Sequence, residues 1–324
     1  MNAMKYDCAP MEGITGSIYR NIHHQYFPGV DQYYTPFLSP SRDHVFTKRD
    51  KREIFPEYNQ NIPVVPQLLT RVADDFLWAA NALEDLGYRA VNLNLGCPSG
   101  TVTAKGKGSG FLADPDALDT FLEEIFSRSP IPISIKTRLG MRDPGEFDRL
   151  LAIYNRYPVA CLILHPRVRQ DFYRLPARRE AFASYYPRCD APVCYNGDLF
   201  TPRDCEAFAR EFPQVERVMV GRGLIADPAL IQRGQGGGGA DRTRLRAFHD
   251  DLYEGYCQAF GNRRSAMLRM KEIWYFHIHL FRDSQRHGKA LRKARDTAEY
   301  EYWVDAVFGD LELLEEAVPR WQEG

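Results

Sequence analysis

Cys97 is the residue whose type and surroundings most directly suggest chemistry. It lies in Asn94-Leu95-Gly96-Cys97-Pro98-Ser99, where an apolar run gives way to a glycine-rich segment. The other six cysteines are scattered, mostly among apolar residues, and no two cysteines form a C-x-x-C pair, which argues against a disulfide framework or a zinc site. A thiol without an adjacent imidazole is mostly protonated near neutral pH, so we expect Cys97 to act as a general acid.

Polar or distinctive side chains recur at the ends of several other apolar, β-branched runs. These residues are Pro10, Met11, Glu12, Gln67, Asn94, Lys136, Arg138, His165, Arg167 and Asn196. In a parallel barrel the carboxyl ends of all strands meet on one face, which is where such barrels carry their active sites. The convergence of six strand ends therefore predicts a site that no single one of these residues would establish.

Two glycine-containing loops follow the last two runs, and both suit an anion. They read Asn196-Gly197-Asp198 and Gly221-Arg222-Gly223. Glycine lets backbone N–H groups approach a phosphate, and an arginine can donate to its oxygens in a forked geometry. We expect a phosphorylated cofactor there. The pattern Gly221-x-Gly223-x-x-Ala226 also fits a dinucleotide fingerprint, but no strand with an acidic partner follows it.

The elements that must position these residues are alternating strands and helices. Eight apolar runs read as strands: Tyr6-Ala9, Gln32-Tyr34, Val64-Leu68, Ala90-Leu95, Ile133-Arg138, Cys161-His165, Val193-Asn196 and Arg217-Val220. Helical periodicity follows several of them, over 74–86, 116–126, 146–157 and 202–211, the last with Thr201 as its N-cap. Eight such units predict a (β/α)8 TIM barrel.

A second domain is expected after the barrel. The segment 234–241 contains five glycines and reads as a flexible link, so residues 1–233 would form the barrel domain. Residues 242–324 have few helix breakers and carry apolar residues at three- and four-residue spacing, as in Leu245, Phe248 and Leu252. We therefore expect a small all-helical C-terminal domain.

Composition and charge narrow the possible classes of protein. With 44% hydrophobic residues the 324-residue chain can bury a large core, yet it has no uncharged apolar run long enough to span a membrane. The N-terminal residues lack the order of a signal peptide, so a cytoplasmic location is expected. We also expect a monomer and no metal. The net charge of −1 is uneven, because ten basic residues oppose two acidic ones between Arg263 and Arg295.

Six motifs make the chain resemble the tRNA-dihydrouridine synthase family. In order, they are Ala9-Pro10-Met11-Glu12-Gly13, the segment 92–99 around Cys97, Ile135-Lys136-Thr137-Arg138-Leu139-Gly140, His165-Pro166-Arg167, Asn196-Gly197-Asp198 and Val220-Gly221-Arg222-Gly223. The resemblance implies that the barrel binds FMN, that NADPH reduces it, and that hydride then passes to C6 of a uracil in tRNA. It also implies that Cys97 protonates C5.

The resemblance further assigns residues to the cofactor and to the RNA. Residues implied to bind FMN are Pro10, Met11 and Gln67 at the isoalloxazine, Lys136 and His165 at its pyrimidine edge, and Asn196, Asp198, Gly221 and Arg222 at the phosphate end, with Glu12 and Gly197 as further cofactor-binding residues. Asn94 and Arg167 would lie nearer the uracil, and Arg138 is a further residue expected to contact the RNA substrate. Because the target base must leave the RNA stack, a further RNA-binding surface is needed.

The expected RNA-binding surface has two parts. The loop 99–114 would act as a lid over Cys97, with Lys105 and Lys107 supplying positive charge. In the helical domain, Arg264, Lys271, Arg292 and Lys293 would bind phosphates, with aromatic residues between them.

Other interpretations remain open from the sequence. The chain could be a different FMN barrel reductase that acts on a free pyrimidine or another small molecule, although the basic helical domain argues against this. It could reduce uridines in rRNA rather than tRNA. It could also lack a flavin, either as a thiol enzyme with Cys97 as nucleophile or as an RNA-binding protein.

Overall fold

The computed structural model describes residues 4–318, which form two compact units. The first unit comprises the described residues up to Pro10, Gln32–Asp198 and Pro213–Met219. The second comprises Met11–Asp31, Leu199–Phe212 and the described residues from Val220 onward. Within residues 4–318, no helix has the length and apolar character needed to cross a membrane.

A parallel sheet of nine strands forms the first unit, in the order β3-β2-β1-β9-β8-β7-β6-β5-β4. The strands are β1 (Lys5–Cys8), β2 (Gln32–Tyr34), β3 (Val64–Val65), β4 (Gln67–Leu68), β5 (Val91–Leu95), β6 (Ile133–Gly140), β7 (Leu162–Val168), β8 (Val193–Tyr195) and β9 (Arg217–Val220). The strand pairings with a defined register are all parallel, as in Asn94 with Lys136 and Arg138 with His165.

The sheet curls into a nearly closed barrel, which confirms the predicted TIM-like fold. Its two ends, β3 and β4, are parts of one predicted strand, separated in the chain only by Pro66. Proline has no N–H to donate, which accounts for the break, while its carbonyl accepts from the backbone N–H of Asn92 at 2.8 Å. Because β3 pairs with β2 and β4 pairs with β5, the eight predicted strand runs close on themselves.

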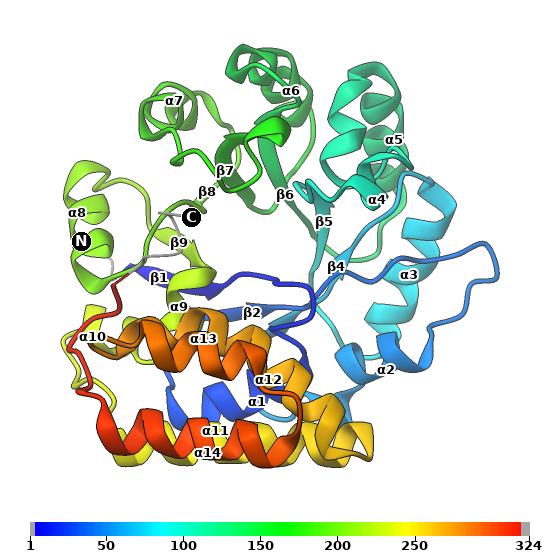
Figure 1. The fold of residues 1–324 in the computed structure, drawn as a ribbon. Helices are drawn as coiled ribbons and strands as arrows, with labels where there is room; N and C mark the ends of the chain where they lie inside the picture. The colour runs from blue at the N-terminus through cyan, green and yellow to red at the C-terminus, as the bar shows by residue number, and fades with distance from the viewer. Residues whose placement is uncertain (1–3, 319–324) are drawn as a thin grey trace. The chain divides into compact units, whose positions relative to one another are not determined.

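Helices of the first unit cover the outside of these strands (Figure 1). They are α2 (Lys48–Ile54), α3 (Ala73–Asp85), α4 (Gly100–Thr103), α5 (Pro115–Arg128), α6 (Phe147–Tyr154) and α7 (Arg179–Tyr185), with 3₁₀ turns including η2 (Gly108–Ala113). The interior contains a small cluster of buried side chains: Ala9, Tyr34, Val65, Ile163, Cys194 and Met219. Burial of this apolar surface is the main favourable contribution to the barrel.

The second unit is helical. Its helices are α1 (Ser17–Tyr26), α8 (Pro202–Glu211), α9 (Arg222–Ala226), α10 (Leu230–Gly234), α11 (Arg242–Phe260), α12 (Arg263–His277), α13 (Gln285–Lys293) and α14 (Thr297–Asp310). Thr201 caps α8 as predicted, in a reciprocal pair with Asp204. Helix α14 lies along α11 (Figure 1), and the two are linked by Arg246 and Asp305 at 2.6 Å.

The glycine-rich segment predicted as a linker lies between α10 and α11, and residues 235–239 are exposed. The helices α1, α8, α9 and α10 belong to the same compact unit as the C-terminal helices, although they precede the glycine-rich segment in the chain. Domain boundaries at 233 and 242, which come from composition, therefore stay a prediction.

Candidate active site

The backbone of Cys97, just after the carboxyl end of β5, is held by hydrogen bonds at both its N–H and its carbonyl. The side-chain oxygen of Asn94 accepts from the backbone N–H groups of Gly96 and Cys97 at 3.1 and 3.0 Å. The carbonyl of Cys97 accepts from the N–H and hydroxyl of Ser109 at 3.1 and 2.8 Å. Its side chain is half-buried. These bonds fix the backbone on either side of the residue that carries the thiol.

The segment 99–114, predicted as a mobile lid, is folded against Cys97. It contains α4 and η2, and Phe111 and Leu112 in η2 are buried. Gly108 has φ of +57°, and a Cβ there would lie 2.9 Å from the Cys97 carbonyl oxygen and 3.0 Å from its Cβ. Only glycine suits both the backbone conformation and this close approach.

The two lysines of this segment differ in environment. Lys105 is exposed, whereas Lys107 is half-buried, with its amino group 3.5 Å from the hydroxyl of Ser39. Burial lowers the pKa of Lys107, and the charge of Lys105 acts in the same direction. Both lysines belong to the segment 99–114 that packs against Cys97.

A chain of buried amides inside the barrel fixes Asn94. Gln67 accepts from the amide of Asn94 at 2.8 Å and donates to Asn92 at 2.7 Å, and Asn92 donates to the hydroxyl of Ser134 at 2.8 Å. The sequence predicts Gln67 and Asn94 as site residues, but not Asn92 or Ser134. The signal is present in Val91-Asn92-Leu93-Asn94, because alternate residues of a strand face the same side.

Lys136 is a half-buried residue within β6, opposite Asn94 of β5. Burial first, and then the charge of Arg138, lower the pKa of Lys136 to about 8. Among residues 4–318 its amino group has no hydrogen-bond acceptor or carboxylate partner. A desolvated cation without a counter-ion is costly, so this position favours an anion or an electron-rich group.

His165, on the neighbouring strand β7, is buried and neutral. Burial, followed by the charges of Arg138, Lys136 and Arg167, keeps the pKa of His165 well below its usual value. Its Nδ1 lies 2.6 Å from the carbonyl of Asn196, so Nδ1 carries the proton and donates it to that carbonyl. The lone pair of Nε2 then accepts from Arg167 at 3.2 Å.

Arg167 and Asp198 form an ion pair at 2.6 Å that also holds the segment between β7 and α7. Arg167 is 1% exposed and donates to the carbonyl of Leu175 at 2.5 Å, while Asp198 accepts from the N–H of Ala177 at 2.9 Å. The family resemblance assigns Asp198 to a phosphate and Arg167 to the substrate. The structure brings them together, which the sequence does not indicate.

Arg138 is also 1% exposed, and backbone carbonyls take up its donors. It donates to Gly96 at 2.8 Å and to Val168 and Phe172 at 3.0 Å each, with its guanidinium 5.2 Å from the ring of Tyr173. Arg138 therefore joins the Cys97 loop to the end of β7. Arg138 therefore has a structural role in addition to its predicted contact with the substrate, which stays a prediction.

The loop after β8 is set by Asn196 and Gly197. The amide of Asn196 donates to the carbonyl of Met219 at 2.8 Å, which links the end of β8 to β9. Gly197 packs on the ring of Tyr195 so closely that a Cβ would overlap the phenol. Pro10, half-buried after β1, completes the predicted cofactor residues of this unit.

Four predicted cofactor residues belong to the second unit. Met11 starts a turn in which its N–H donates to the hydroxyl of Thr15 at 2.7 Å, and Glu12 follows as an exposed residue. Gly221 is the N-cap of α9, whose first residue, Arg222, places its guanidinium 5.1 Å from the ring of Phe200.

The predicted RNA-binding residues of the helical unit are of two kinds. Lys271 donates to the carbonyl of Ala294 at 2.7 Å, so its amino group caps the C-terminus of α13. Arg264, Arg292 and Lys293 are exposed, and none pairs with a carboxylate in the described part of the chain. No cluster of potential metal ligands exists among residues 4–318.

Comparison with known proteins gives the family. A family model described as Dihydrouridine synthase (Dus) matches residues 7–319. The chain belongs to the dihydrouridine synthase family. It is 26% identical to the tRNA-dihydrouridine(16) synthase of Cupriavidus necator, with 93% of this chain and 96% of that protein covered.

Two further relatives of the family are 30% identical to this chain. The tRNA-dihydrouridine(16) synthase of Pseudomonas putida matches 70% of this chain and 72% of its own length. The probable tRNA-dihydrouridine synthase 1 of Synechocystis sp. matches 69% of this chain, and the match covers 62% of that protein.

Solved structures share the fold of this dihydrouridine synthase family member. Histamine dehydrogenase from Rhizobium sp. 4-9 has a TM-score of 0.52 at 11% identity, covering 76% of this chain and 46% of that one. A variant of NCR from Zymomonas mobilis has a TM-score of 0.50 at 13% identity, covering 78% and 92%. Such low identities support the barrel fold and nothing finer.

Proposed function

We propose that this protein reduces uridines in tRNA to 5,6-dihydrouridine, with FMN as its cofactor and NADPH as the reductant. One observation carries the proposal: of the paired strands β5 and β6, the first leads directly into the fixed backbone of Cys97, and the second carries Lys136, which lacks a counter-ion within residues 4–318. Two of the similar proteins are named tRNA-dihydrouridine(16) synthase, which supports tRNA as the substrate class.

The residues present suit a flavin. Three cations, Lys136, Arg138 and Arg167, lie around neutral His165. Of these three, only Arg167 forms an ion pair within residues 4–318, and its partner is Asp198. An excess of positive charge beside a desolvated amine favours an anionic ring edge, which is how a protein stabilises reduced flavin. When bound, FMN would supply the hydride for the uracil.

The family resemblance extends the proposed FMN site to other residues. Residues proposed to contact the isoalloxazine are Pro10, Met11 and Gln67, and those for the phosphate end are Asn196, Asp198, Gly221 and Arg222, with Glu12 and Gly197 as further cofactor-binding residues. For Gln67 and Asp198 we add a second task. Gln67 holds Asn94, and Asp198 neutralises Arg167, so both also position the residues proposed to face uracil.

The protein's own part in the reaction is to hold the uracil and supply a proton. Reduction of the C5–C6 double bond needs a hydride at C6 and a proton at C5. We propose that the Cys97 thiol donates this proton. The Asn94 amide and Ser109 hydroxyl fix the backbone on either side of Cys97, which keeps the donor in place between turnovers.

The proposed function is tested by mapping dihydrouridine in cellular RNA. RNA from cells with and without this protein is digested and analysed by mass spectrometry, since reduction adds two hydrogens to uridine. We expect loss of dihydrouridine at specific tRNA positions in cells without the protein. Loss in rRNA only would replace tRNA as the substrate, and unchanged RNA would contradict the proposal.

A Cys97→Ala variant tests the proposed acid. NADPH-driven reduction of bound FMN should stay within about twofold of the wild type, because the thiol is not needed for it. Dihydrouridine formation in tRNA should fall by about 10²- to 10⁴-fold, the usual contribution of a positioned general acid. Ser99→Ala, two residues away, is the matched control and should keep its activity. Undiminished turnover in Cys97→Ala would remove the acid from the mechanism.

A further inference from the structure

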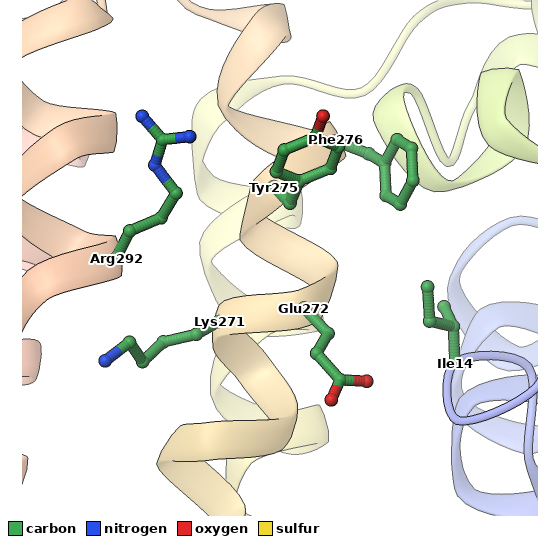
Figure 2. Close-up of a pocket in the computed structure, with 6 residues that line it drawn as sticks. All are labelled: Ile14, Lys271, Glu272, Tyr275, Phe276 and Arg292. Atoms are coloured by element: carbon green, nitrogen blue, oxygen red, sulfur yellow. The ribbon is translucent and has the colours of Figure 1, made fainter. Parts of the chain in front are cut away.

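An apolar hollow on the helical unit has no role in the chemistry above. It has a volume of about 380 Å³ and is lined by Ile14, Lys271, Glu272, Tyr275, Phe276 and Arg292. Figure 2 shows Lys271, Glu272, Tyr275 and Phe276 on one helix, α12, with Arg292 on one side and Ile14 on the other. All six residues belong to the second unit, so the hollow is complete within it.

The floor and walls of the hollow are held in place. Lys271 is fixed by its bond to Ala294 at the end of α13, and Glu272 by its ion pair with Arg269 at 2.6 Å. Arg269 also donates to the carbonyl of Gly13, next to Ile14. The hollow therefore exists before any ligand arrives, which reduces the entropic cost of binding.

An aromatic surface is exposed in the hollow. Tyr275 is 43% exposed, and its ring meets that of Phe276 edge to face, with centroids 4.9 Å apart. The exposed tyrosine and the half-buried phenylalanine together present an aromatic surface to a ligand in the hollow. A flat ring is the shape that such a surface accepts by stacking.

The charges around the hollow indicate what kind of ring binds there. Arg286, Lys289, Arg292 and Lys293 lie on α13, and within residues 4–318 none pairs with a carboxylate. Spacings of three and four residues place Arg286, Lys289 and Lys293 on one helix face, with Arg292 at its edge. Such a row of cations suits a phosphate backbone, whereas apolar walls and the carboxylate of Glu272 make the hollow itself unsuitable for phosphate.

We propose that this hollow binds an unpaired base of the RNA substrate, stacked on Tyr275, while the α13 cations hold the adjacent phosphates. A basic groove with aromatic stacking positions is the usual combination for single-stranded nucleic acid. The inference rests on the proposed function for the identity of the RNA. It adds a second base-binding position, outside the barrel, that would fix where the target uridine lies.

The test compares Tyr275→Ala with Tyr302→Ala in the full-length, FMN-loaded protein. Tyr302 is 64% exposed on α14 and does not line the hollow, which makes it the matched control. The probe is unfractionated tRNA from cells that lack dihydrouridine synthases, with binding measured by fluorescence anisotropy. We expect roughly tenfold or greater loss of affinity for Tyr275→Ala, little change for Tyr302→Ala, and near-normal binding for Tyr275→Trp.

Ultraviolet cross-linking identifies the contact directly. A peptide containing Tyr275 or Phe276 should carry a nucleotide adduct in the wild type, and the Tyr275→Ala protein should lose it. Equal affinity and equal cross-linking in the two alanine variants would overturn the inference. So would a concentration-dependent dimer that Tyr275→Ala abolishes, because a second copy would then occupy the hollow.

Kinetics separate this inference from the proposed function. Tyr275→Ala should raise the KM for tRNA while kcat and FMN content stay near wild-type values, since the hollow lies outside the reacting groups. If the wild type forms no dihydrouridine in any RNA but still binds tRNA through Tyr275, the proposed function fails and the base-binding position stands. If dihydrouridine forms and Tyr275→Ala leaves the KM for tRNA unchanged, the proposed function stands and the base-binding position fails.

Discussion

At the scale of the residue, Lys136 is a proposed cofactor-binding group whose charge depends on its surroundings. Its ammonium is half-buried beside Arg138, and these two causes lower its pKa to about 8. In the free protein Lys136 therefore loses its proton as the pH rises through about 8. A ring edge that accepts a hydrogen bond from the ammonium, as the pyrimidine edge of FMN can, would raise this pKa again, because such a bond favours the protonated form.

The affinity for FMN should consequently fall as the pH rises through about 8. Below that pH the amine is protonated in free and bound protein, so affinity is constant; above it, binding must take up a proton, which costs up to about tenfold per pH unit. Titration of apoprotein with FMN between about pH 7 and 9.5 measures this. Lys136→Met should bind more weakly with a nearly flat profile, and Cys97→Ala should keep the drop. A flat wild-type profile would contradict the assignment of Lys136.

At the scale of the element, the α4–η2 segment determines the position of Cys97. Gly108→Ala should strain the backbone at φ of +57° and push a methyl group against the Cys97 carbonyl. We expect about 1–3 kcal/mol less stability and at least about tenfold slower dihydrouridine formation, with FMN still bound. Thermal unfolding and single-turnover kinetics measure these effects.

Gly100→Ala is the matched control for that variant. A Cβ at Gly100 meets no atom within 4 Å, and the residue starts α4, where alanine is a better helix former. It should therefore leave stability and rate nearly unchanged. If Gly108→Ala and Gly100→Ala had the same stability and the same rate of dihydrouridine formation, the close approach of Gly108 to Cys97 would not be needed for activity.

Elements are more predictable from the sequence than the contacts between them. The runs Ala90-Leu95, Ile133-Arg138 and Cys161-His165 are apolar and regularly spaced, so their strands and their common edge follow from pattern alone. Cross-strand partners require register, which is why the sequence does not predict the bond between Asn92 and Ser134. Arg138 binds backbone carbonyls, and no residue type in a sequence marks those.

At the scale of the whole chain, charge is distributed so that one helix stays uncompensated. Two acidic residues of α14 pair with cations of α11 and α12, Asp305 with Arg246 and Glu301 with Arg263, while Asp310 lies 3.9 Å from the imidazole of His287 on α13. Glu312, after α14, pairs with Arg282 before α13. The lysines and arginines of α13 itself have no carboxylate partner among residues 4–318, so the overall net charge of −1 conceals a local surface that attracts phosphates.

RNA binding should therefore weaken with salt, and α13 should supply a measurable part of that dependence. Each phosphate neutralised by the protein adds about 0.7 to 0.9 to the steepness with which log affinity falls against log salt. Lys289→Gln combined with Lys293→Gln should reduce this steepness by about 1.4 to 1.8, measured by tRNA anisotropy between about 50 and 300 mM salt, the range where such interactions dominate. Arg282→Gln removes a cation that is already paired with Glu312, so its slope should stay near the wild type. An unchanged slope in the double variant would mean that tRNA phosphates lie elsewhere, because exposed charges that bind RNA cannot be removed without releasing fewer counter-ions.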